Sequence, residues 1–519
     1  MKIKVIPILL CLLCITNAVA QKKQNVLMIV LDDLNDFTGV LKGHPQAHTP
    51  NIDRLAKEGV LFTNAHSNVP VCSPSRASFM NGISPVTSGY WGFKNWKQNN
   101  LLMACKSIPE YFMENGYHTA KSGKVFHSSK KGAWHDEGVK TDYGPIAFDG
   151  LKAAQHPSCP ESMFQLGALD ATFTSLDDIP KVKANDQAPG YNGWYLTKLK
   201  KGFKYINDND RDLMSDEASV EWFKSKIQKL ETSEHRDPFF ISLGFHRPHT
   251  PLVVPQKYFD LFPLETVKIP KINFNDTEDT KLGENSIKES RGRKAYRWLT
   301  ESYSSVELAL KKYTQAYLAS VAFADDMVGK ALETLEESSF KENTTIILFS
   351  DHGYNIGEKE YLFKYCLWEE STRVPLIIKS PFYEKSIGKQ VDHPVSLIDI
   401  YPTLKDLCKL EGNTIINSSG APLDGYSLKP FIENPKTNQW EGPDTAFTIV
   451  SSWKSKLAEK QHVSVRSKQY RYIRYANGSE ELYNHKKDDF EWHNLAEDKK
   501  YLKIKETHRK QLDLWLKIE

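Results

Sequence analysis

Continuous apolar runs alternate with helix-like segments along most of the chain. The runs within 25–36, 237–246 and 344–353 are apolar at most positions and end in polar residues. Such runs are typical of parallel strands that are buried on both faces of a sheet. The segment 50–58 follows a threonine, begins with a proline and is followed by a glycine. This pattern predicts a helix before the next strand. The alternation predicts an α/β fold with a doubly wound sheet.

The same reading predicts the remaining organisation of the chain. A long helix is expected at 313–337, and the polar stretches 181–212 and 265–305 are expected to be irregular surface insertions that shape a substrate site. From about Gly442 the pattern changes to short strands followed by a helix near 501–518, which predicts a small α+β C-terminal subdomain with an antiparallel sheet. The expected domains are therefore a signal peptide at 1–20, a catalytic domain at 21–441 and this subdomain at 442–519.

The N-terminus has the three parts of a secretory signal. Lys2 and Lys4 precede an apolar run at 6–15, and Ala18-Val19-Ala20 provides small residues for cleavage. The run is too short to cross a bilayer comfortably, and no later apolar stretch is long enough to do so. We expect an exported protein, periplasmic or secreted, with no membrane span.

Composition and charge exclude one class of partner and draw attention to the cysteines. The chain has 519 residues and a net charge of +3, which gives no large basic field for nucleic acid. Five cysteines remain beyond the expected signal, so at least one lacks a disulfide partner within the chain. Cys72 is the candidate, because its neighbours include residues suited to chemistry.

Acidic and imidazole side chains follow several of the predicted strands. They are Asp32, Asp33, His246, Asp351 and His352. Ligands of doubly wound sheets bind beyond the carboxyl ends of the strands, so these side chains are expected to converge. Carboxylate oxygens suit a hard divalent cation, calcium or magnesium. The alternative is that each aspartate caps a separate helix or forms a turn.

Cys72 lies at a predicted helix start in PVCSPSRASFMNG, where backbone N–H groups and the helix dipole stabilise anions. Arg76 lies one turn further on and can reach back toward residue 72. The alternatives are a buried apolar cysteine or one half of a disulfide.

These motifs resemble those of the type I sulfatases. CSPSR matches the Cys-x-Pro-x-Arg core of that family, and VLDDLND, SGKVFH, SDHGYNIGE and ELYNHKKDDFEWHNLA are similar to its other conserved blocks. GKVFH, GFHRPHTPL and the Asp-His of SDHG are closest to the iduronate-2-sulfatase group of polysaccharide sulfatases. The resemblance implies an alkaline-phosphatase/sulfatase-like fold and sulfate ester hydrolysis.

The resemblance also implies a modified nucleophile. In this family a formylglycine-generating or sulfatase-maturing enzyme oxidises the cysteine, here Cys72, to formylglycine. The aldehyde hydrates, and one hydroxyl attacks sulfur as the sugar alcohol leaves, which puts a sulfate ester on residue 72. Loss of the second hydroxyl's proton then expels sulfate and regenerates the aldehyde. The resemblance implies that one calcium ion, or magnesium in its place, is bound by Asp32, Asp33, Asp351, His352 and residue 72. It also implies that Lys124 and Lys364 bind sulfate and that Arg76 orients the hydrated aldehyde. His127 is implied to accept a proton, and His246 to protonate or bind the leaving sugar oxygen.

Two other functions are compatible with parts of the sequence. A phosphatase or phosphonate hydrolase of the same superfamily would share fold and metal chemistry, and a non-catalytic protein that binds sulfated glycans would keep an unmodified thiol at residue 72. The expected substrate is a sulfated oligo- or polysaccharide, either a glycosaminoglycan or an algal glycan such as ulvan. The sequence leaves the sugar and the sulfate position open.

Overall fold

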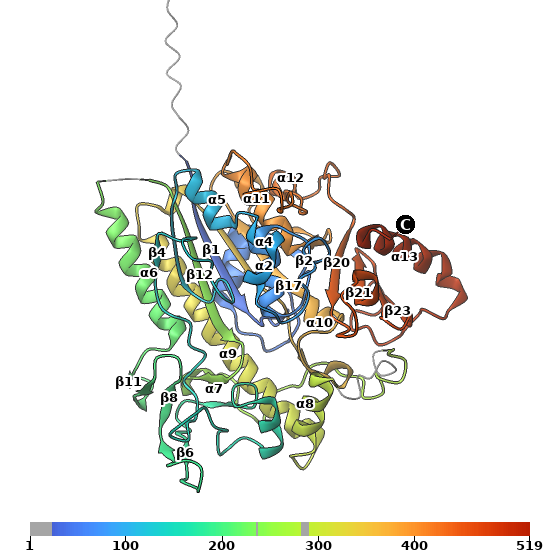
Figure 1. Ribbon diagram of the computed structural model, residues 1–519. Helices are drawn as coiled ribbons and strands as arrows, with labels where there is room; N and C mark the ends of the chain where they lie inside the picture. The colour runs from blue at the N-terminus through green and yellow to red at the C-terminus, as the bar shows by residue number, and fades with distance from the viewer. Residues whose placement is uncertain (1–22, 235–236, 282–289, 519) are drawn as a thin grey trace, which may run out of the picture.

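A nine-stranded sheet forms the centre of the molecule (Figure 1). The computed structural model describes residues 23–234, 237–281 and 290–518, so the expected signal peptide at 1–20 lies outside the described residues. The strand order along the main path is β18 (Lys389–Val391), β2 (Val60–His66), β17 (Arg373–Lys379), β14 (Thr344–Ser350), β1 (Asn25–Asp32), β12 (Phe239–Pro248), β3 (His118–Gly123) and β4 (Asp136–Glu137), with β19 (Val395–Ser396) paired to β2.

The middle of this sheet is parallel. β1 pairs in parallel with both β14 and β12, and β12 pairs in parallel with β3. β17 differs, because it runs antiparallel between β14 and β2. The α/β architecture expected from the apolar runs is therefore confirmed, with one strand reversed.

The two faces of β1 belong to two separate hydrophobic cores. Leu27, Ile29 and Leu31 lie in one core, whereas the alternate residues Val26 and Met28 lie in the other, as the period of an extended strand requires. Helices pack on both faces and contribute to each core: α1 (Pro50–Glu58), α6 (Ser215–Glu231) and α9 (Val306–Glu336) on the first face, and α2 (Cys72–Asn81), α5 (Ile108–Glu114) and α11 (Ile400–Leu407) on the second.

Shorter elements connect and flank these layers. They are α3 (Pro85–Ser88), α4 (Asn100–Met103), α7 (Gln256–Phe259), α10 (Glu369–Thr372), α12 (Lys429–Glu433), β5 (Phe173–Ser175), β13 (Leu252–Val254), β15 (Asn355–Ile356) and β16 (Leu362–Phe363). None of the helices in the described residues is long and apolar enough to cross a membrane.

The two stretches expected to be irregular contain regular structure. In 181–212 the chain forms short hairpin strands: β6 (Lys181–Val182), β7 (Tyr191–Asn192), β8 (Trp194–Leu196), β9 (Lys201–Phe203), β10 (Tyr205–Asn207) and β11 (Asp210–Arg211). Within 265–305, helix α8 (Arg291–Thr300) was not predicted; residues 282–289 lie outside the described residues. α8 is polar except for a narrow stripe that includes Ala295 and Leu299, so tertiary packing stabilises it more than its sequence pattern suggests.

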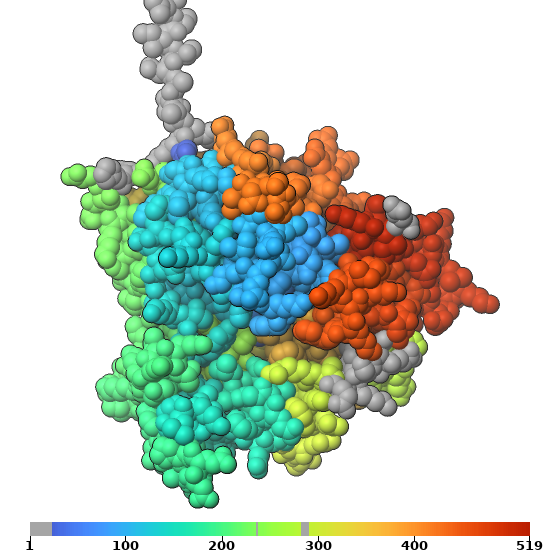
Figure 2. Space-filling model, viewed as in Figure 1, coloured from blue at the N-terminus to red at the C-terminus, as the bar shows by residue number. Residues whose placement is uncertain are grey.

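A second sheet occupies the C-terminal part of the chain. It is antiparallel and contains β20 (Thr445–Val450), β21 (His462–Ser467), β22 (Tyr470–Arg474) and β23 (Glu480–Asn484), followed by α13 (Leu502–Leu516). Figure 2 shows this part, in orange and red, packed beside the blue N-terminal segments. Buried ion pairs link the two parts, because Arg466 and Arg471 of the second sheet contact Glu369 of α10. The small α+β C-terminal subdomain was expected from the short strands after Gly442.

Candidate active site

The carboxyl ends of the central parallel strands bring distant residues together. Asp32 ends β1, Asp351 directly follows β14, and Lys124 directly follows β3. Since these strands are parallel, their carboxyl ends lie at one edge of the sheet. All three side chains are buried, and the Lys124 ammonium donates a hydrogen bond to Asp32. The convergence expected from the sequence therefore occurs.

Asp33 joins this group through an unusual backbone conformation. Successive side chains of a strand point to opposite faces, so two adjacent aspartates would normally diverge. Asp33 follows the end of β1 and has a φ of 66°, a left-handed conformation that aspartate tolerates better than most residues. Its carboxylate accepts hydrogen bonds from Lys364 Nζ at 2.7 and 2.9 Å and lies 3.4 Å from His352 Nδ1.

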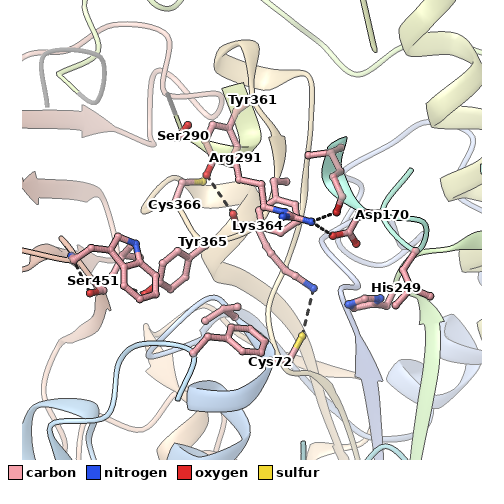
Figure 3. Close-up of a pocket in the computed structure, with 18 of the residues that line it drawn as sticks. Cys72, Asp170, His249, Ser290, Arg291, Tyr361, Lys364, Tyr365, Cys366 and Ser451 are labelled. Atoms are coloured by element: carbon pink, nitrogen blue, oxygen red, sulfur yellow. Dashed lines mark hydrogen bonds and ion pairs between the residues drawn. The ribbon is translucent and has the colours of Figure 1, made fainter. Parts of the chain in front are cut away.

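Cys72 begins helix α2 and faces this cluster. Its Sγ lies 3.4 Å from Asp32 Oδ1, 3.3 Å from His352 Nε2 and 3.3 Å from Lys364 Nζ (Figure 3). Burial, together with the charge of Asp32, raises the pKa of the thiol, so Cys72 is a neutral thiol near pH 7. All five cysteines of the described chain are free and buried, so Cys72 has no disulfide partner there.

Each buried carboxylate of the cluster has a cationic partner. Arg76 Nε donates to Asp351 Oδ2 at 2.7 Å, and Arg76 Nη2 lies 3.5 Å from Asp32 Oδ1. Burial alone would raise the pKa of Asp32, but Lys124 and other cations hold it well below its usual range. Burial raises the pKa of Asp33 to about 8 in spite of the charge of Lys364.

Two observations indicate that this cluster can bind a cation and a further hydrogen-bond acceptor. Within the described residues, Asp32, Cys72, Asp351 and His352 offer four ligand atoms within 4.8 Å of one another, as do Asp32, Asp33, Cys72 and His249. Carboxylate oxygens supply two of the four ligand atoms in each set, and such oxygens suit a hard divalent cation. In addition, Arg76 Nη2 is buried and makes no hydrogen bond within the described residues, although it lies 3.5 Å from Asp32 Oδ1, so it can donate to an acceptor that a cysteine thiol does not supply.

A cavity of about 1010 Å³ opens above Cys72. Pockets for small molecules reach about 1,000 Å³, so this one has room for more than a sulfate group. The Arg291–Asp170 ion pair forms part of its wall (Figure 3). The residues near the chemistry that line it are Cys72, His127, Tyr143, His249 and Lys364, and those from the C-terminal part include Ser451, Ser452, Trp453, His462 and Tyr475.

Two histidines of one motif are placed differently relative to this cavity. His246, the residue expected to act on the sugar oxygen, is buried and does not line the cavity, and its Nδ1 lies 3.0 Å from Asp216 Oδ1. His249 lines the cavity instead, and its Nε2 lies 3.9 Å from Asp33 Oδ2. Both histidines occur in GFHRPHTPL, so the motif was recognised but strand geometry was needed to distinguish them.

His127 lines the cavity as expected. Its ring contacts that of Phe93 edge-on, with 5.3 Å between centroids. Burial and the charge of Lys124 lower the pKa of His127 to about 4, so the imidazole is neutral near pH 7 and can accept a proton.

Close backbone contact between β12 and the end of β3 fixes the position of Lys124. The Gly244 carbonyl oxygen accepts a hydrogen bond from Lys124 N–H at 2.8 Å, and a Cβ at Gly244 would lie 2.1 Å from the Lys124 carbonyl carbon. We expect Gly244→Ala to displace Lys124 and to lower kcat at least about tenfold, because small misplacements of positioning groups are costly. Ser242→Ala on the same strand is the control, since its buried hydroxyl has no partner in the described chain. Equal kcat for Gly244→Ala and the parent would contradict this prediction.

Comparison with known proteins assigns the family. The sulfatase profile matches residues 24–410, and the profile of the N-sulphoglucosamine sulphohydrolase C-terminal region matches residues 357–517. The chain belongs to the sulfatase family and is a sulfuric ester hydrolase.

Relatives extend over most of the chain. It is 34% identical to a sulfatase of Formosa agariphila over 92% of this chain and 84% of that protein. It is 29% identical to mouse iduronate 2-sulfatase, over 74% of this chain and 69% of the relative. It is 27% identical to an ulvan-active sulfatase of Formosa agariphila, over 95% and 80% of the two chains.

Solved structures share the fold. A phosphonate monoester hydrolase of Agrobacterium radiobacter superposes with a TM-score of 0.66 at 21% identity, covering 95% of both chains. A 2-O GAG sulfatase superposes with a TM-score of 0.65 at 21% identity, covering 96% of this chain and 92% of the other. The alkaline-phosphatase/sulfatase-like fold expected from the sequence is thereby confirmed.

Proposed function

We propose that the protein is an exported, formylglycine-dependent sulfatase that binds calcium and removes sulfate from sugars of a sulfated polysaccharide or its oligosaccharides. The observation that carries the proposal is the position of Cys72, at the start of a buried helix and at the floor of the large cavity. Its Sγ lies within 3.4 Å of a carboxylate, an imidazole and an ammonium group. An ordinary structural cysteine needs no such neighbours.

Residue 72 provides the nucleophile in this proposal. As formylglycine it supplies, once hydrated, a hydroxyl that can attack sulfur. The unpartnered Arg76 Nη2 supports this assignment, because a hydrated aldehyde offers the acceptor oxygen that the thiol lacks. Lys364 faces the cavity beside residue 72 and binds a sulfate oxygen. Lys124, beneath the floor, adds positive charge against the negative charge that develops on sulfate.

Asp32, Asp33, Asp351 and His352, together with residue 72, would hold the calcium ion. When bound, a divalent cation supplies Lewis acidity that favours deprotonation of a nearby hydroxyl and offsets the charge of the sulfate group. The chain contributes three buried carboxylates, and Arg76 keeps Asp351 oriented toward the cluster.

The two cavity histidines take the proton-transfer roles. His127, neutral near pH 7, accepts the proton that residue 72 loses. We assign His249, in place of His246, to the leaving sugar oxygen, because a group that donates a proton to the substrate must reach the cavity. His249 Nδ1 lies 2.6 Å from the Thr250 carbonyl oxygen, which acts as its acceptor, so Nε2 is the atom that can carry the transferable proton. Burial and the charge of Lys364 hold the pKa of His249 well below its usual range in the free protein, and an anionic sulfate ester nearby would raise that pKa.

The histidine roles are separable by leaving group. An aryl sulfate needs little protonation of its leaving oxygen, whereas a sugar alcohol needs it. We expect His249→Ala to lower kcat/KM about 10²- to 10⁴-fold for sugar sulfates and far less for 4-nitrophenyl sulfate. His127→Ala should lower both to a similar degree. If His246→Ala, rather than His249→Ala, shows the leaving-group dependence, the assignment returns to His246.

The relatives favour a glycan substrate. One is named an ulvan-active sulfatase and another an iduronate 2-sulfatase, and both names refer to sulfated sugars. The size of the cavity and the wall contributed by the C-terminal part fit a sugar ring attached to further residues. Export, which the N-terminal sequence favours, would place the enzyme where such polysaccharides occur.

The decisive experiment combines desulfation assays with mass spectrometry. The mature protein is incubated with defined oligosaccharides from ulvan, heparin and chondroitin sulfate, and the peptide containing residue 72 is analysed from the same preparation. Sulfate release by protein that carries formylglycine supports the proposal. A pure thiol at residue 72 with glycan binding but no turnover would favour a binding protein, and hydrolysis of phosphonate esters but not sulfate esters would favour a phosphonate hydrolase.

A further inference from the structure

A second, smaller pocket adjoins the catalytic cavity. It has a volume of about 360 Å³ and shares Ser452 and His462 with the larger cavity. Its remaining lining residues are Lys454, Ser455, Lys460, Ala476 and Asn477, all from the C-terminal part of the chain. Because the two cavities share wall residues, a substrate that fills the first can continue into the second.

The second pocket carries positive charge that no carboxylate neutralises. No ion pair within the described residues engages the ammonium groups of Lys454 or Lys460. The lining contains no aspartate or glutamate, and its other polar groups are hydroxyl, amide and imidazole groups. Two cations beside neutral donors match an anionic, oxygen-rich ligand.

His462 adds an oriented donor at the junction. Its Nδ1 accepts a hydrogen bond from Ala476 N at 3.2 Å, so the neutral ring carries its proton on Nε2. Burial and the charge of Lys454 lower the pKa of His462 to about 4, which keeps the ring neutral near pH 7. His462 can therefore donate to a ligand oxygen without being charged itself.

Trp453 lines the first pocket, and the next residue in the chain, Lys454, lines the second. Its side chain is 66% exposed, although tryptophan is normally mostly buried. Its backbone φ is 60°, an uncommon conformation for a bulky residue, and Ser451 Oγ accepts a hydrogen bond from its N–H at 3.0 Å. Gly92 packs beside the ring, since a Cβ at that position would lie 3.5 Å from it, at ordinary contact distance. An exposed aromatic ring held in this way is suited to contact with the apolar face of a sugar.

We propose that Lys454, Lys460 and His462 form a second subsite, which binds the carboxylate or sulfate of the sugar next to the one that is desulfated, while Trp453 contacts the ring of that neighbouring sugar. The proposal rests on the proposed function. A second subsite implies that the substrate is an anionic chain of at least two sugars and not a sulfated monosaccharide.

Binding to protein with Cys72→Ala tests the subsite without turnover. The probes are size-defined tetrasaccharides from ulvan and from heparin, measured by calorimetry at low and high salt. We expect at least one to bind, and the added Lys454→Ala/Lys460→Ala pair to weaken that binding about 3- to 30-fold, more at low salt. Lys456→Ala in the same loop is the matched control, because Lys456 lines neither pocket.

The chemistry of the bound anion is resolved by a modified probe. If carboxyl reduction of the tetrasaccharide removes the difference between the parent and the double variant, the subsite binds a carboxylate; if the difference persists, it binds a sulfate. Binding of neither tetrasaccharide, or equal affinities for parent and double variant, would overturn the proposal. If only the subsite proposal is wrong, protein with Cys72 intact still carries formylglycine and still releases sulfate. If the proposed function is wrong, it does not, so the two failures are distinguishable.

Discussion

Cys72→Ala is expected to lower turnover of every sulfate ester by roughly 10⁵-fold or more, because loss of a covalent nucleophile costs about this much in other enzymes. The free energy of unfolding should change by only about 1 kcal/mol, since the substitution removes one sulfur atom and leaves α2 intact. Steady-state kinetics and denaturant unfolding of the same preparation provide both values.

Cys72→Ser is the informative companion. Serine retains a hydroxyl of similar size but cannot yield formylglycine unless the maturing enzyme accepts it. Cys366→Ala is the control for a buried free cysteine that lies in the cavity wall but outside the charged cluster. Substantial turnover by Cys72→Ala would contradict the mechanism, whereas a large loss in Cys366→Ala alone would point to the cavity wall as the sensitive feature.

Removal of the cation is the second change with a large expected effect. We expect chelation to abolish activity and calcium to restore it better than zinc, because most of the ligands are carboxylate oxygens. Asp351→Asn removes one charge from the cluster. Changes outside the ligand shell typically weaken metal binding about 10- to 100-fold, and we expect Asp351→Asn to weaken calcium binding by more than that.

Thermal unfolding gives a readout that does not depend on activity. A cation at 100 times its Kd stabilises the folded protein by about 2.7 kcal/mol, so calcium should raise the Tm of the parent and not that of Asp351→Asn. Asp325→Asn is the matched control, because Asp325 is a buried carboxylate that accepts hydrogen bonds from the backbone at the start of α1, away from the cluster. Stoichiometric zinc in active enzyme, with no calcium or magnesium, would refute the assignment.

The central sheet was predictable because burial on both faces leaves a plain signal. β1, β12 and β14 are apolar along their length, and the polar residues that follow them mark the functional edge. Helix α8 was not predictable in this way. Its sequence RGRKAYRWLT is mostly polar, and only contacts with distant parts of the chain identify its buried side.

The chemical centre was more predictable than the cavity around it. Cys72 and Arg76 occur in one compact motif, and the aspartates directly follow apolar strand runs, so the sequence alone marks them. His246 and His249 are three residues apart in one motif, and only the path of the chain after β12 decides which of them faces the cavity. Trp453 and Arg291 gave no signal, because each becomes part of the wall through packing between segments that are far apart in sequence.

Two parts of the chain form the cavity, and they have different roles. Its floor includes Cys72 at the start of α2, whereas Trp453 and His462 in its wall, and Lys454 in the adjoining pocket, come from the connection between β20 and β21 and from the start of β21. Buried pairs such as Glu369–Arg471 anchor the second sheet without passing through that connection. Exchange of residues 451–461 can therefore redirect the same hydrolytic centre to a different glycan, which makes this loop the natural place to engineer, or for evolution to diversify, substrate choice.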